Sequence, residues 1–504
     1  MKRIFTLVNI VLLICIAFNV YSNNILVQKV ALTDTDTVNK SVLINFDLSW
    51  SNSWRDDINW DAAWVIVKFK KPNGHWGHAN FSVNGNTIDS SNAQMKITVP
   101  ADKKGAFIYR VQKGNGDNLL TKVKILWNYG SDGISNLSDI EVRVFATEMV
   151  YVPGGSFAVG DGAKPDGYNM ATNLRNAAYG YEYLIINDTL SDPMVRTPLN
   201  GSTSPAFRVD GIRGLDKNSD GIIDNADYPT GYKPFYCMKY ETSQGQFADF
   251  LNTISLDSTD ANYGQTASTY LLILGQQLFP VNPGNRFTIS RQDSVFLATR
   301  PDRACNYLTA LAKNIYAFAD WAGLRPMSEL EFEKACRGPL APVAFENAGG
   351  TFVGLTSPPT NTITLTLSGE ENGTETITST FAVPPTAFKI SGGDGGSGPL
   401  RVGIFATPNS TRISSASSYY GIQDLTTNLS EYVEFCVPKP DLTYSTHGDG
   451  YINSSYRYTN ITTWVEETTA YGLKSNFVSG MYGTYMNTDG NSGFRGVRSA
   501  PAEN

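Results

Sequence analysis

The chain has 504 residues, of which 41% are hydrophobic and 12% are aromatic, and its formal net charge at pH 7 is −7. This length allows two or three domains with a sizeable hydrophobic core. An acidic chain without a basic cluster argues against nucleic acid and anionic membranes as partners. The abundance of Thr, Ser, Asn, Gly and Tyr favours strands and loops over a helix bundle.

The first segment of the chain has the pattern of a secretory signal peptide. Lys2 and Arg3 give a positive start, Ile10–Ala17 is the centre of an apolar run, and small residues follow at an acceptable cleavage site. An uncleaved membrane anchor is one alternative, although the run is short for a span. Cys15 admits a lipoprotein, although the residue before it is large for that modification. No later stretch is apolar enough to cross a membrane. We therefore expect residues 1–22 to be removed and the mature protein to be exported to the periplasm, the cell surface or the exterior.

The cysteines after this segment are Cys237, Cys305, Cys336 and Cys436. None has CxxC spacing, and each lies within an apolar element rather than a polar loop. Four cysteines allow three pairings if all are bridged. The pattern is typical of buried thiols or of a single bridge, and it leaves the bonding open.

Residues 24–147 are predicted to form an all-β sandwich. Every second residue of the segment 42–50 is apolar (Val42, Ile44, Phe46, Leu48 and Trp50), which is the period of a half-buried strand. Further apolar runs, separated by Gly, Asn and Asp, occupy residues 64–69, 107–111, 123–127 and 140–145.

Four tryptophans crowd one part of this module, namely Trp50, Trp54, Trp60 and Trp64. They are typical of a Trp-rich core and rim, and the alternative is an aromatic platform for a sugar or a peptide. His75 and His78 lie close in sequence, but they have no third ligand nearby, which argues against a metal site there.

The segment 216–227 has the residue spacing of a calcium-binding loop. Ligand positions 1, 3, 5, 7, 9 and 12 of such a loop are occupied in turn by Asp216, Asn218, Asp220, Ile222, Asp224 and Asp227. Gly221 permits the sharp turn, and Ile222 offers its backbone carbonyl. Because no convincing helices flank the segment, we expect an isolated loop that binds one Ca²⁺. The alternative is a loop held only by its own Asx turns.

Two later segments carry signals for the start of a helix. Ser243 and Gln246 have the spacing of a capping box, and so do Ser328 and Glu331. Apolar residues with helical spacing follow each pair, and Gly338 is a typical end for the second helix. The sequence therefore predicts helices beginning after Ser243 and Ser328.

Five segments in this order resemble motifs of the formylglycine-generating, sulfatase-modifying-factor family. They are MVYVPGGSFAVGDG (149–162), KPFYCMKYETSQGQFADFLNTI (233–254), GLRPMSELEFEKACRG (323–338), YYGIQDLTTNLSEYVEFC (419–436) and GFRGVRSAP (493–501). The resemblance spans residues 149–501 and implies the family's irregular α+β fold, which is related to the C-type lectin fold. We therefore expect a multi-domain chain with an N-terminal all-β sandwich followed by a sulfatase-modifying-factor domain with insertions.

The resemblance also allows the catalytic sites of the family to be compared with this chain. Formylglycine-generating members hold copper with two cysteines beyond the fourth motif, but no cysteine follows Cys436, and a soft copper site needs thiolates. Iron-dependent relatives use three histidines, whereas the only histidines here are His75, His78 and His447. We expect a pseudoenzyme, degenerate at the catalytic site, without copper, iron or a nucleotide.

In relatives, the loop of the fourth motif binds a structural calcium ion through an Asn and a Glu side chain. The matching residues are Asn428 and Glu431, so the resemblance implies a second calcium site. The alternative is a turn held by hydrogen bonds of these two side chains.

Aromatic residues in the C-terminal tail are interleaved with Asn, Ser, Thr and Gly, as in recognition loops. The candidate ligand-binding residues are Tyr451, Tyr456, Tyr458, Trp464, Tyr482 and Tyr485. The variable proteins of diversity-generating elements have a related fold and a similar region that ends in GFR. An ordinary surface loop with some core tyrosines is the alternative.

An inserted β-hairpin is expected at about 344–398, because Thr alternates with apolar residues around Glu-Glu-Asn-Gly.

Three functions remain open for the protein. The first is an exported, non-catalytic binding or scaffold protein that recognises a protein or glycan at the cell surface. The second is a divergent oxidase or other enzyme with a polar pocket near His447, Asp449 and Arg457. The third is a structural subunit of a cell-surface or secretion assembly.

Overall fold

The computed structural model of the protein describes most of the N-terminal half and selected parts of the rest. The described residues are 25–89, 91, 94–159, 184–186, 228–254, 286, 288–292, 295–305, 312–343, 348–350, 366–368, 376–378, 399–406, 410–425, 428–433, 446–451, 477–479, 482–483 and 492–501. The predicted signal peptide 1–22 and the predicted calcium loop 216–227 lie outside them.

The first sheet is antiparallel and has the strand order β1-β2-β7. It consists of β1 (Leu26–Asp36), β2 (Ser41–Arg55) and β7 (Gly114–Trp127). The alternation predicted for β2 is confirmed, because every second side chain from Val42 to Trp50 is buried. The polar residues between them lie on the outer face of the sheet.

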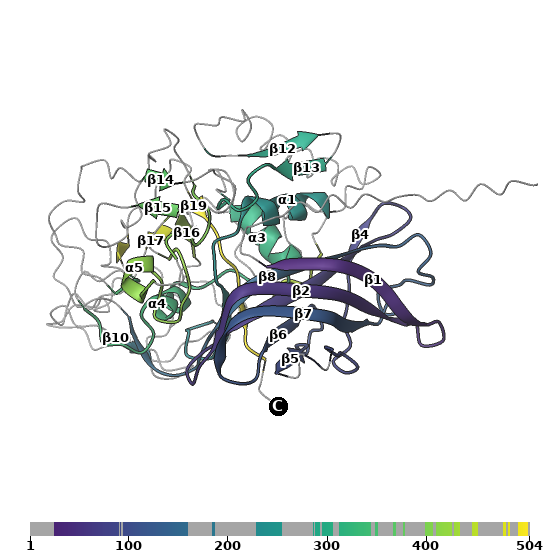
Figure 1. The fold of residues 1–504 in the computed structure, drawn as a ribbon, viewed down its shortest axis with the longest axis horizontal. Coiled ribbons are helices and arrows are strands. Elements are labelled where there is room, and N and C mark those ends of the chain that lie inside the picture. The colour runs from purple at the N-terminus through teal and green to yellow at the C-terminus, as the bar shows by residue number, and fades with distance from the viewer. Residues whose placement is uncertain are drawn as a thin grey trace, which may run out of the picture.

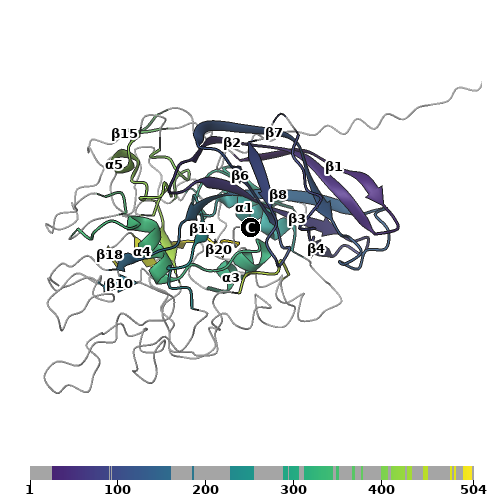
Figure 2. The same cartoon turned by 90° about the horizontal axis from the view of Figure 1, so that it is seen from below.

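The second sheet has seven strands in the order β20-β11-β8-β3-β6-β5, with β4 also paired to β3. Its strands are β3 (Asp61–Lys70), β4 (Trp76–His78), β5 (Met95–Thr98), β6 (Ala106–Arg110), β8 (Glu141–Val152), β11 (Phe235–Met238) and β20 (Val497–Ser499). The strand pairs are antiparallel. Figure 2 shows β20, from the C-terminal end of the chain, beside β11.

The second sheet is covered on both faces. One face packs against the first sheet, and the shared core includes Phe46, Val65 and Ile125. The other face packs against helices α1 (Gln244–Asn252) and α3 (Ala312–Trp321), which lie together in Figure 1. Because both faces are covered, β3 is buried along almost its whole length, as is typical of a central strand.

Strand β8 passes through residue 148, where the sequence prediction divides the chain into two domains. Residues 141–150 of this strand pair with β3, and residues 149–152 pair with β11. The predicted sandwich and the predicted second domain therefore share one continuous sheet, and the expected boundary falls inside a strand.

The remaining elements are short. They are β9 (Phe157–Val159), β10 (Leu184–Ile186), β12 (Ile289–Gln292), β13 (Val295–Ala298), α4 (Glu329–Arg337), β14 (Thr366–Ser368), β15 (Thr376–Thr378), α5 (Arg412–Ser415), β16 (Ser430–Tyr432), β17 (Phe477–Ser479), β18 (Tyr482–Gly483) and β19 (Ser492–Gly493). Strands β14 and β15 pair antiparallel within the segment where a hairpin is expected. The described part is thus mainly β-sheet with four helices.

Both predicted capping boxes are confirmed. At the start of α1, Ser243 Oγ accepts from the Gln246 N–H and Gln246 Oε1 accepts from the Ser243 N–H. At the start of α4, Ser328 and Glu331 make the same reciprocal pair. Gly338 ends α4 with a φ of 65°, a conformation that costs glycine little.

The tryptophans and cysteines of the described part lie mainly in the core. Trp50, Trp60 and Trp64 are exposed by only 1%, 7% and 1%, so the interpretation as core residues is confirmed for them. Cys237, Cys305 and Cys336 are free and buried, and Cys436 lies outside the described residues. Among the described residues, no helix is long and apolar enough to cross a membrane.

Candidate functional site

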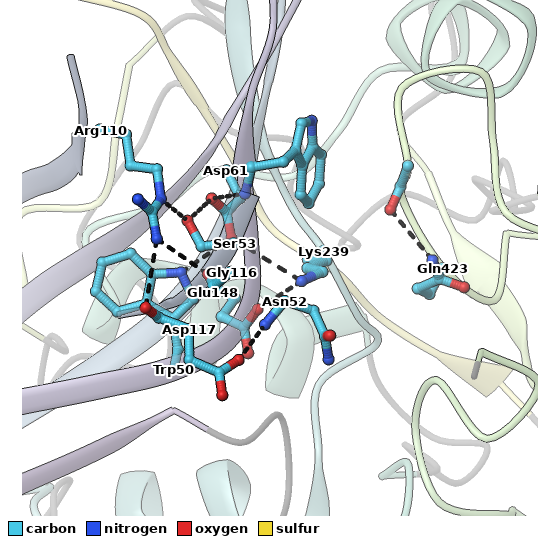
Figure 3. Close-up of polar contacts among 12 residues, drawn as sticks. Trp50, Asn52, Ser53, Asp61, Arg110, Gly116, Asp117, Glu148, Lys239 and Gln423 are labelled. Atoms are coloured by element: carbon cyan, nitrogen blue, oxygen red, sulfur yellow. Dashed lines mark hydrogen bonds and ion pairs between the residues drawn. The ribbon is translucent and has the colours of Figure 1, made fainter. Parts of the chain in front are cut away.

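Three neighbouring strands bring a lysine and two acids together inside the molecule. Asp61 begins β3, Glu148 lies in β8, and Lys239 directly follows β11. Lys239 Nζ lies 2.8 Å from Glu148 Oε2 and 4.0 Å from Asp61 Oδ2. The three side chains are exposed by 5% or less. We call Asp61, Glu148 and Lys239 the lysine cluster (Figure 3).

Asp61 is held by three donors from β2. Its Oδ2 accepts from the Trp50 indole N–H at 2.9 Å. Its Oδ1 accepts from Ser53 Oγ at 2.6 Å and from the Trp54 backbone N–H at 3.1 Å. Figure 3 shows Trp50 and Ser53 converging on this carboxyl group. The two sheets are therefore joined through one buried side chain.

The lysine cluster has one more acid than base, and burial decides its protonation. Burial raises the pKa of Glu148 to about 7, although Lys239 acts in the opposite direction. Burial also raises the pKa of Asp61. Burial alone would lower the pKa of Lys239, but Glu148, Tyr240 and Asp61 together raise it. Near neutral pH the cluster therefore readily holds an extra proton on a carboxyl group.

A second buried cluster, which we call the arginine cluster, contains Glu241, Asp424, Glu431 and Arg495. Arg495 Nε donates to Glu431 Oε1 at 2.6 Å, and Arg495 also donates to the backbone carbonyl of Lys239 at 3.3 Å. All four side chains are exposed by 1% or less. Burial raises the pKa of Glu241, and the charges of Asp424 and Glu431 raise it further.

The arginine cluster fixes the loop that precedes β16. Glu241 Oε2 accepts from Asn428 Nδ2 at 2.6 Å, and its Oε1 accepts from the Leu429 N–H at 2.9 Å. Asn428 Oδ1 accepts from the Leu400 N–H at 2.8 Å. Every one of these contacts joins segments that are distant in the chain.

These contacts bear on the calcium site expected at Asn428 and Glu431. The side-chain oxygen of Asn428 is used by the Leu400 N–H, and Glu431 is paired with the Arg495 guanidinium. A cation between them would face a positive charge and an N–H donor. In this arrangement the two side chains do not fit a calcium ion. They also differ from the alternative, a turn held by its own Asn and Glu hydrogen bonds, because their partners Leu400, Glu241 and Arg495 lie in other segments.

A third buried group surrounds Lys68 in β3 and His78 in β4. Lys68 Nζ donates to His78 Nδ1 at 2.9 Å and to the Gly450 carbonyl at 2.8 Å. His78 Nε2 lies 2.7 Å from the Lys104 carbonyl, so this nitrogen carries the hydrogen. Burial lowers the pKa of Lys68 and of His78 well below their usual values.

The segment Thr446–Tyr451 packs against this buried group. The Asp449 N–H donates to Asp320 Oδ1 at 2.9 Å, and the Tyr451 hydroxyl donates to the His78 carbonyl at 3.1 Å. Tyr451, a predicted ligand-binding residue, is exposed by 36%. Its hydroxyl thus ties the tail to the N-terminal strands and leaves part of the ring open to solvent.

The residues of the alternative enzyme pocket are only partly described. His447 Nε2 accepts from the Ser499 N–H at 2.9 Å. Burial, followed by the positive charge of Arg498, lowers the pKa of His447 well below its usual value. Asp449 accepts from the Tyr451 N–H. Arg457 lies outside the described residues.

Most of the other predicted site residues also lie outside the described part of the chain. They are Asp216, Asn218, Asp220, Ile222, Asp224, Asp227, Tyr456, Tyr458, Trp464 and Tyr485. Tyr482 belongs to β18, for which only the backbone is described. Within the described residues, no group of three or more His, Cys, Asp or Glu side chains is arranged to hold a metal ion.

Sequence reasoning missed the lysine cluster. Each of its residues lies in or beside an apolar run: Asp61 before AAWVIV, Glu148 in VFATEMVYV, and Lys239 after PFYCM. A charged residue in a buried strand needs a partner, and that signal marks each position. The sequence does not say which of these positions meet.

Comparisons with known proteins do not assign the chain to a family. No protein-family model matches it, and no curated protein matches it. A solved structure described as "AvmM Catalyzes Macrocyclization in Alchivemycin A Biosynthesis" aligns with 26% of this chain and 73% of its own at 11% identity, with a TM-score of 0.08. At that TM-score the likeness carries no argument about fold or function.

Proposed function

We propose that the protein is an exported, non-catalytic binding or scaffold protein that resembles sulfatase-modifying factors and is stabilised by calcium. The observation that carries this proposal is the use of buried charges as links between distant segments. The Lys68–Gly450 hydrogen bond, for example, joins residues 382 positions apart. The lysine and arginine clusters link other segments in the same way. Because these ionisable side chains hold distant segments together, they support a structural role for the protein.

The state of the described thiols supports a non-catalytic role. Burial raises the pKa of Cys237 to about 12 and also raises the pKa of Cys305 and Cys336. A catalytic or metal-binding cysteine acts as a thiolate and needs an exposed, electropositive setting. These three residues have the opposite setting, so their thiols fill the core.

The binding role rests on the aromatic tail. Tyr451 is its described member, and Lys104 Nζ lies 5.2 Å from the centre of its ring. A half-exposed ring beside a cation, followed by a run of tyrosines and small polar residues, is typical of a recognition surface. We propose that this tail contacts a protein or glycan ligand at the cell surface.

The calcium role rests on the loop 216–227 and on the residues that follow it. Tyr228 is exposed by only 3%, and the Pro229 carbonyl accepts from Ser328 Oγ at 2.6 Å. The exit of the loop is therefore fixed at the start of α4. A calcium ion that ordered the loop would stabilise this junction as well.

Calorimetry and thermal melting of the full chain, with calcium and with chelator, test this proposal. We expect one binding site and a higher melting temperature with calcium, because a ligand that binds only the folded state stabilises it. Both effects are expected to vanish in Asp216→Ala plus Asp220→Ala. The matched control is Asp34→Ala plus Asp57→Ala, at acids whose side chains are 64% and 76% exposed. Wild-type protein that neither binds calcium nor shifts its melting temperature would overturn the calcium role.

A glycan array probed with the full chain tests the binding role. We expect retained glycans to be lost with Tyr456→Ser plus Tyr458→Ser. Binding that persists unchanged in this variant would contradict the role of the tail.

A further inference from the structure

The lysine cluster contains the three groups that a condensation between side chains needs. Lys239 supplies an amine and Asp61 supplies a carboxyl group. Glu148 lies in β8, the strand that pairs with β3 on one side and with β11 on the other. All three are buried at the meeting point of β3, β8 and β11. We propose that Lys239 and Asp61 are joined by an amide bond that forms without a cofactor, with Glu148 as the proton carrier.

Asp61 is the carboxyl group prepared for attack. Three donors, from Trp50, Ser53 and Trp54, point at its two oxygens, and Figure 3 shows the first two. Fixed donors of this kind polarise a carbonyl and stabilise the negative charge that develops on oxygen when a nucleophile adds. Neither oxygen of Glu148 has a comparable set among the described contacts, so Asp61 is the electrophile.

Glu148 is suited to carry protons. Its Oε2 lies 2.8 Å from Lys239 Nζ, a distance that permits direct proton transfer. Its Oε1 is buried and, among the described residues, has no hydrogen-bond partner. An oxygen left free in a buried site can accept the second proton of the reaction or donate to the leaving group.

Lys239 is close enough to react after a small movement. Its Nζ lies 4.0 Å from Asp61 Oδ2, and reacting atoms must approach to about 3–3.5 Å. Because the lysine side chain has four methylene groups, rotation about its terminal bonds provides that approach. The Trp54 ring, whose centre lies 5.2 Å from Nζ, keeps the amine against the acids.

The reaction balances without an oxidant or an added reactant. The one extra proton of the cluster can lie on either acid, since burial raises the pKa of both. The reaction starts from the form with an ammonium on Lys239, a carboxylate on Glu148 and a neutral carboxylic acid on Asp61. Glu148 takes one proton from the ammonium, and the free electron pair of the amine attacks Asp61 Cγ to form the C–N bond. Glu148 then gives its proton to the departing hydroxyl, the C–O bond breaks, and water leaves with that electron pair. Glu148 finally takes the second amine proton, so the product is an amide, one water molecule and a neutral Glu148.

The product suits the site better than the ions do. The starting cluster holds charged groups in a core where charges lose their hydration. The product holds an amide and a neutral acid, which can donate to the amide oxygen. Once water has left the buried site, hydrolysis needs a water molecule to return to it. The bond would also tie β3 to β11 across β8, which joins the predicted sandwich covalently to the later part of the chain.

The surface pair of Lys29 and Asp47 provides a comparison. Its nitrogen and oxygen are only 2.7 Å apart, which is closer than Lys239 and Asp61, but Lys29 is 78% exposed. Water stabilises the charges of such a pair, and among the described residues no second carboxyl group is paired with Lys29. Proximity alone therefore predicts an amide at Lys29, whereas the proposal predicts one at Lys239.

Intact-mass measurement of the purified full chain tests the proposal. We expect a mass lower than that of the linear chain by one water molecule, and a branched peptide that joins Lys239 to Asp61 after digestion. Lys239→Arg keeps the positive charge but cannot form this amide, so its mass should show no loss. Asp61→Asn should lose ammonia in place of water. Glu148→Gln should leave most of the protein unlinked, and Lys29→Arg, the matched control, should keep the full loss of one water.

Each other outcome overturns the proposal. A wild-type mass equal to that of the linear chain shows that the lysine cluster is only an ion pair. A loss of water that persists in Lys239→Arg shows a dehydration elsewhere, such as a cyclised Asp-Gly sequence. A branched peptide at any other pair of residues assigns the bond to that pair. Since the wild-type chain alone can give the first of these results, the test does not depend on whether the variants fold.

Discussion

Two buried charged clusters lie at the end of strand β11, and they differ in their cation. The lysine cluster sets one ammonium against two carboxyl groups, and the arginine cluster sets one guanidinium against three. A guanidinium keeps its proton in proteins, whereas a lysine can lose its proton and act as a nucleophile. The arginine cluster can therefore only be an ionic link, while the lysine cluster has the chemistry to become a covalent one.

The two clusters also fix different parts of the fold. Asp61 and Glu148 belong to paired strands and Lys239 directly follows one, so the lysine cluster joins regular structure. In the arginine cluster, Glu241 accepts from loop groups at Asn428 and Leu429. A covalent bond in the lysine cluster would link strands that are already held in one sheet. The hydrogen bonds of the arginine cluster instead hold a loop whose backbone is not paired in a sheet.

The largest effect is expected from Lys239→Arg, which removes the covalent bond and keeps the charge. We expect the free energy of unfolding to fall by about 5 kcal/mol, by analogy with a disulfide that closes a long loop. Guanidinium unfolding at neutral pH measures the change, with Lys29→Arg as the exposed control. Equal unfolding curves for wild type and Lys239→Arg would contradict the proposal that the lysine cluster is a covalent link and the arginine cluster an ionic one.

The next largest effect is expected from Arg495→Met. The change removes the cation that faces Glu431 and Glu241, and breaking a buried pair in this way costs about 3–5 kcal/mol. The control is Arg143→Met, because Arg143 and its partner Glu141 are 42% and 45% exposed, and such pairs contribute about 1 kcal/mol or less. If the two variants lose the same stability, the arginine cluster is not a structural link.

The pH dependence of stability separates buried acids from buried bases. The pKa of Glu148 is raised to about 7 by burial, so the folded protein holds a proton there that the unfolded chain releases above its ordinary pKa. Stability from this group therefore falls as the pH rises from about 4.5 to about 7, by about 2–4 kcal/mol. The pKa of His447 is lowered by burial and by Arg498, so stability from this group is lost as the pH falls below about 6.5.

Urea unfolding at several pH values measures both predicted changes in the free energy of unfolding. Glu148→Gln should remove the decline toward neutral pH, and His447→Gln should remove the decline toward acid pH. A change of slope in the opposite direction in either variant would contradict the assigned charge states.

The smallest effect is expected from Ser328→Ala, which removes a neutral hydrogen-bonded cap. Ser328 Oγ accepts from the Glu331 N–H at the start of α4, and losing such a cap costs about 1 kcal/mol. Thermal melting of this variant gives a scale against which the charged clusters can be judged. A loss as large as that of Arg495→Met would show that the junction of α4 with Pro229 matters more than the cap.

The elements that the sequence predicted well are those set by neighbouring residues. The capping boxes at Ser243 and Ser328 depend on partners three positions away, and the alternation in β2 depends on a period of two. Both are visible in the order of residues alone. The same reasoning could not show that β8 continues past residue 148, because its partner β11 lies far along the chain.

The candidate site was less predictable for the same physical reason. The family resemblance pointed to Asn428 and Glu431, but their partners Leu400 and Arg495 come from other segments. Only the fold shows that these partners occupy the expected calcium ligands. The lysine cluster is assembled from three strands, so no local pattern reveals it, and the calcium loop 216–227 stays a prediction.

The most direct measurement is the distance between Lys239 Nζ and Asp61 Cγ in a crystal structure of the purified protein. A covalent link predicts about 1.33 Å, the length of an amide C–N bond. A separation of about 3 Å or more, as in an ion pair or a hydrogen bond, would contradict it and make the two clusters alike.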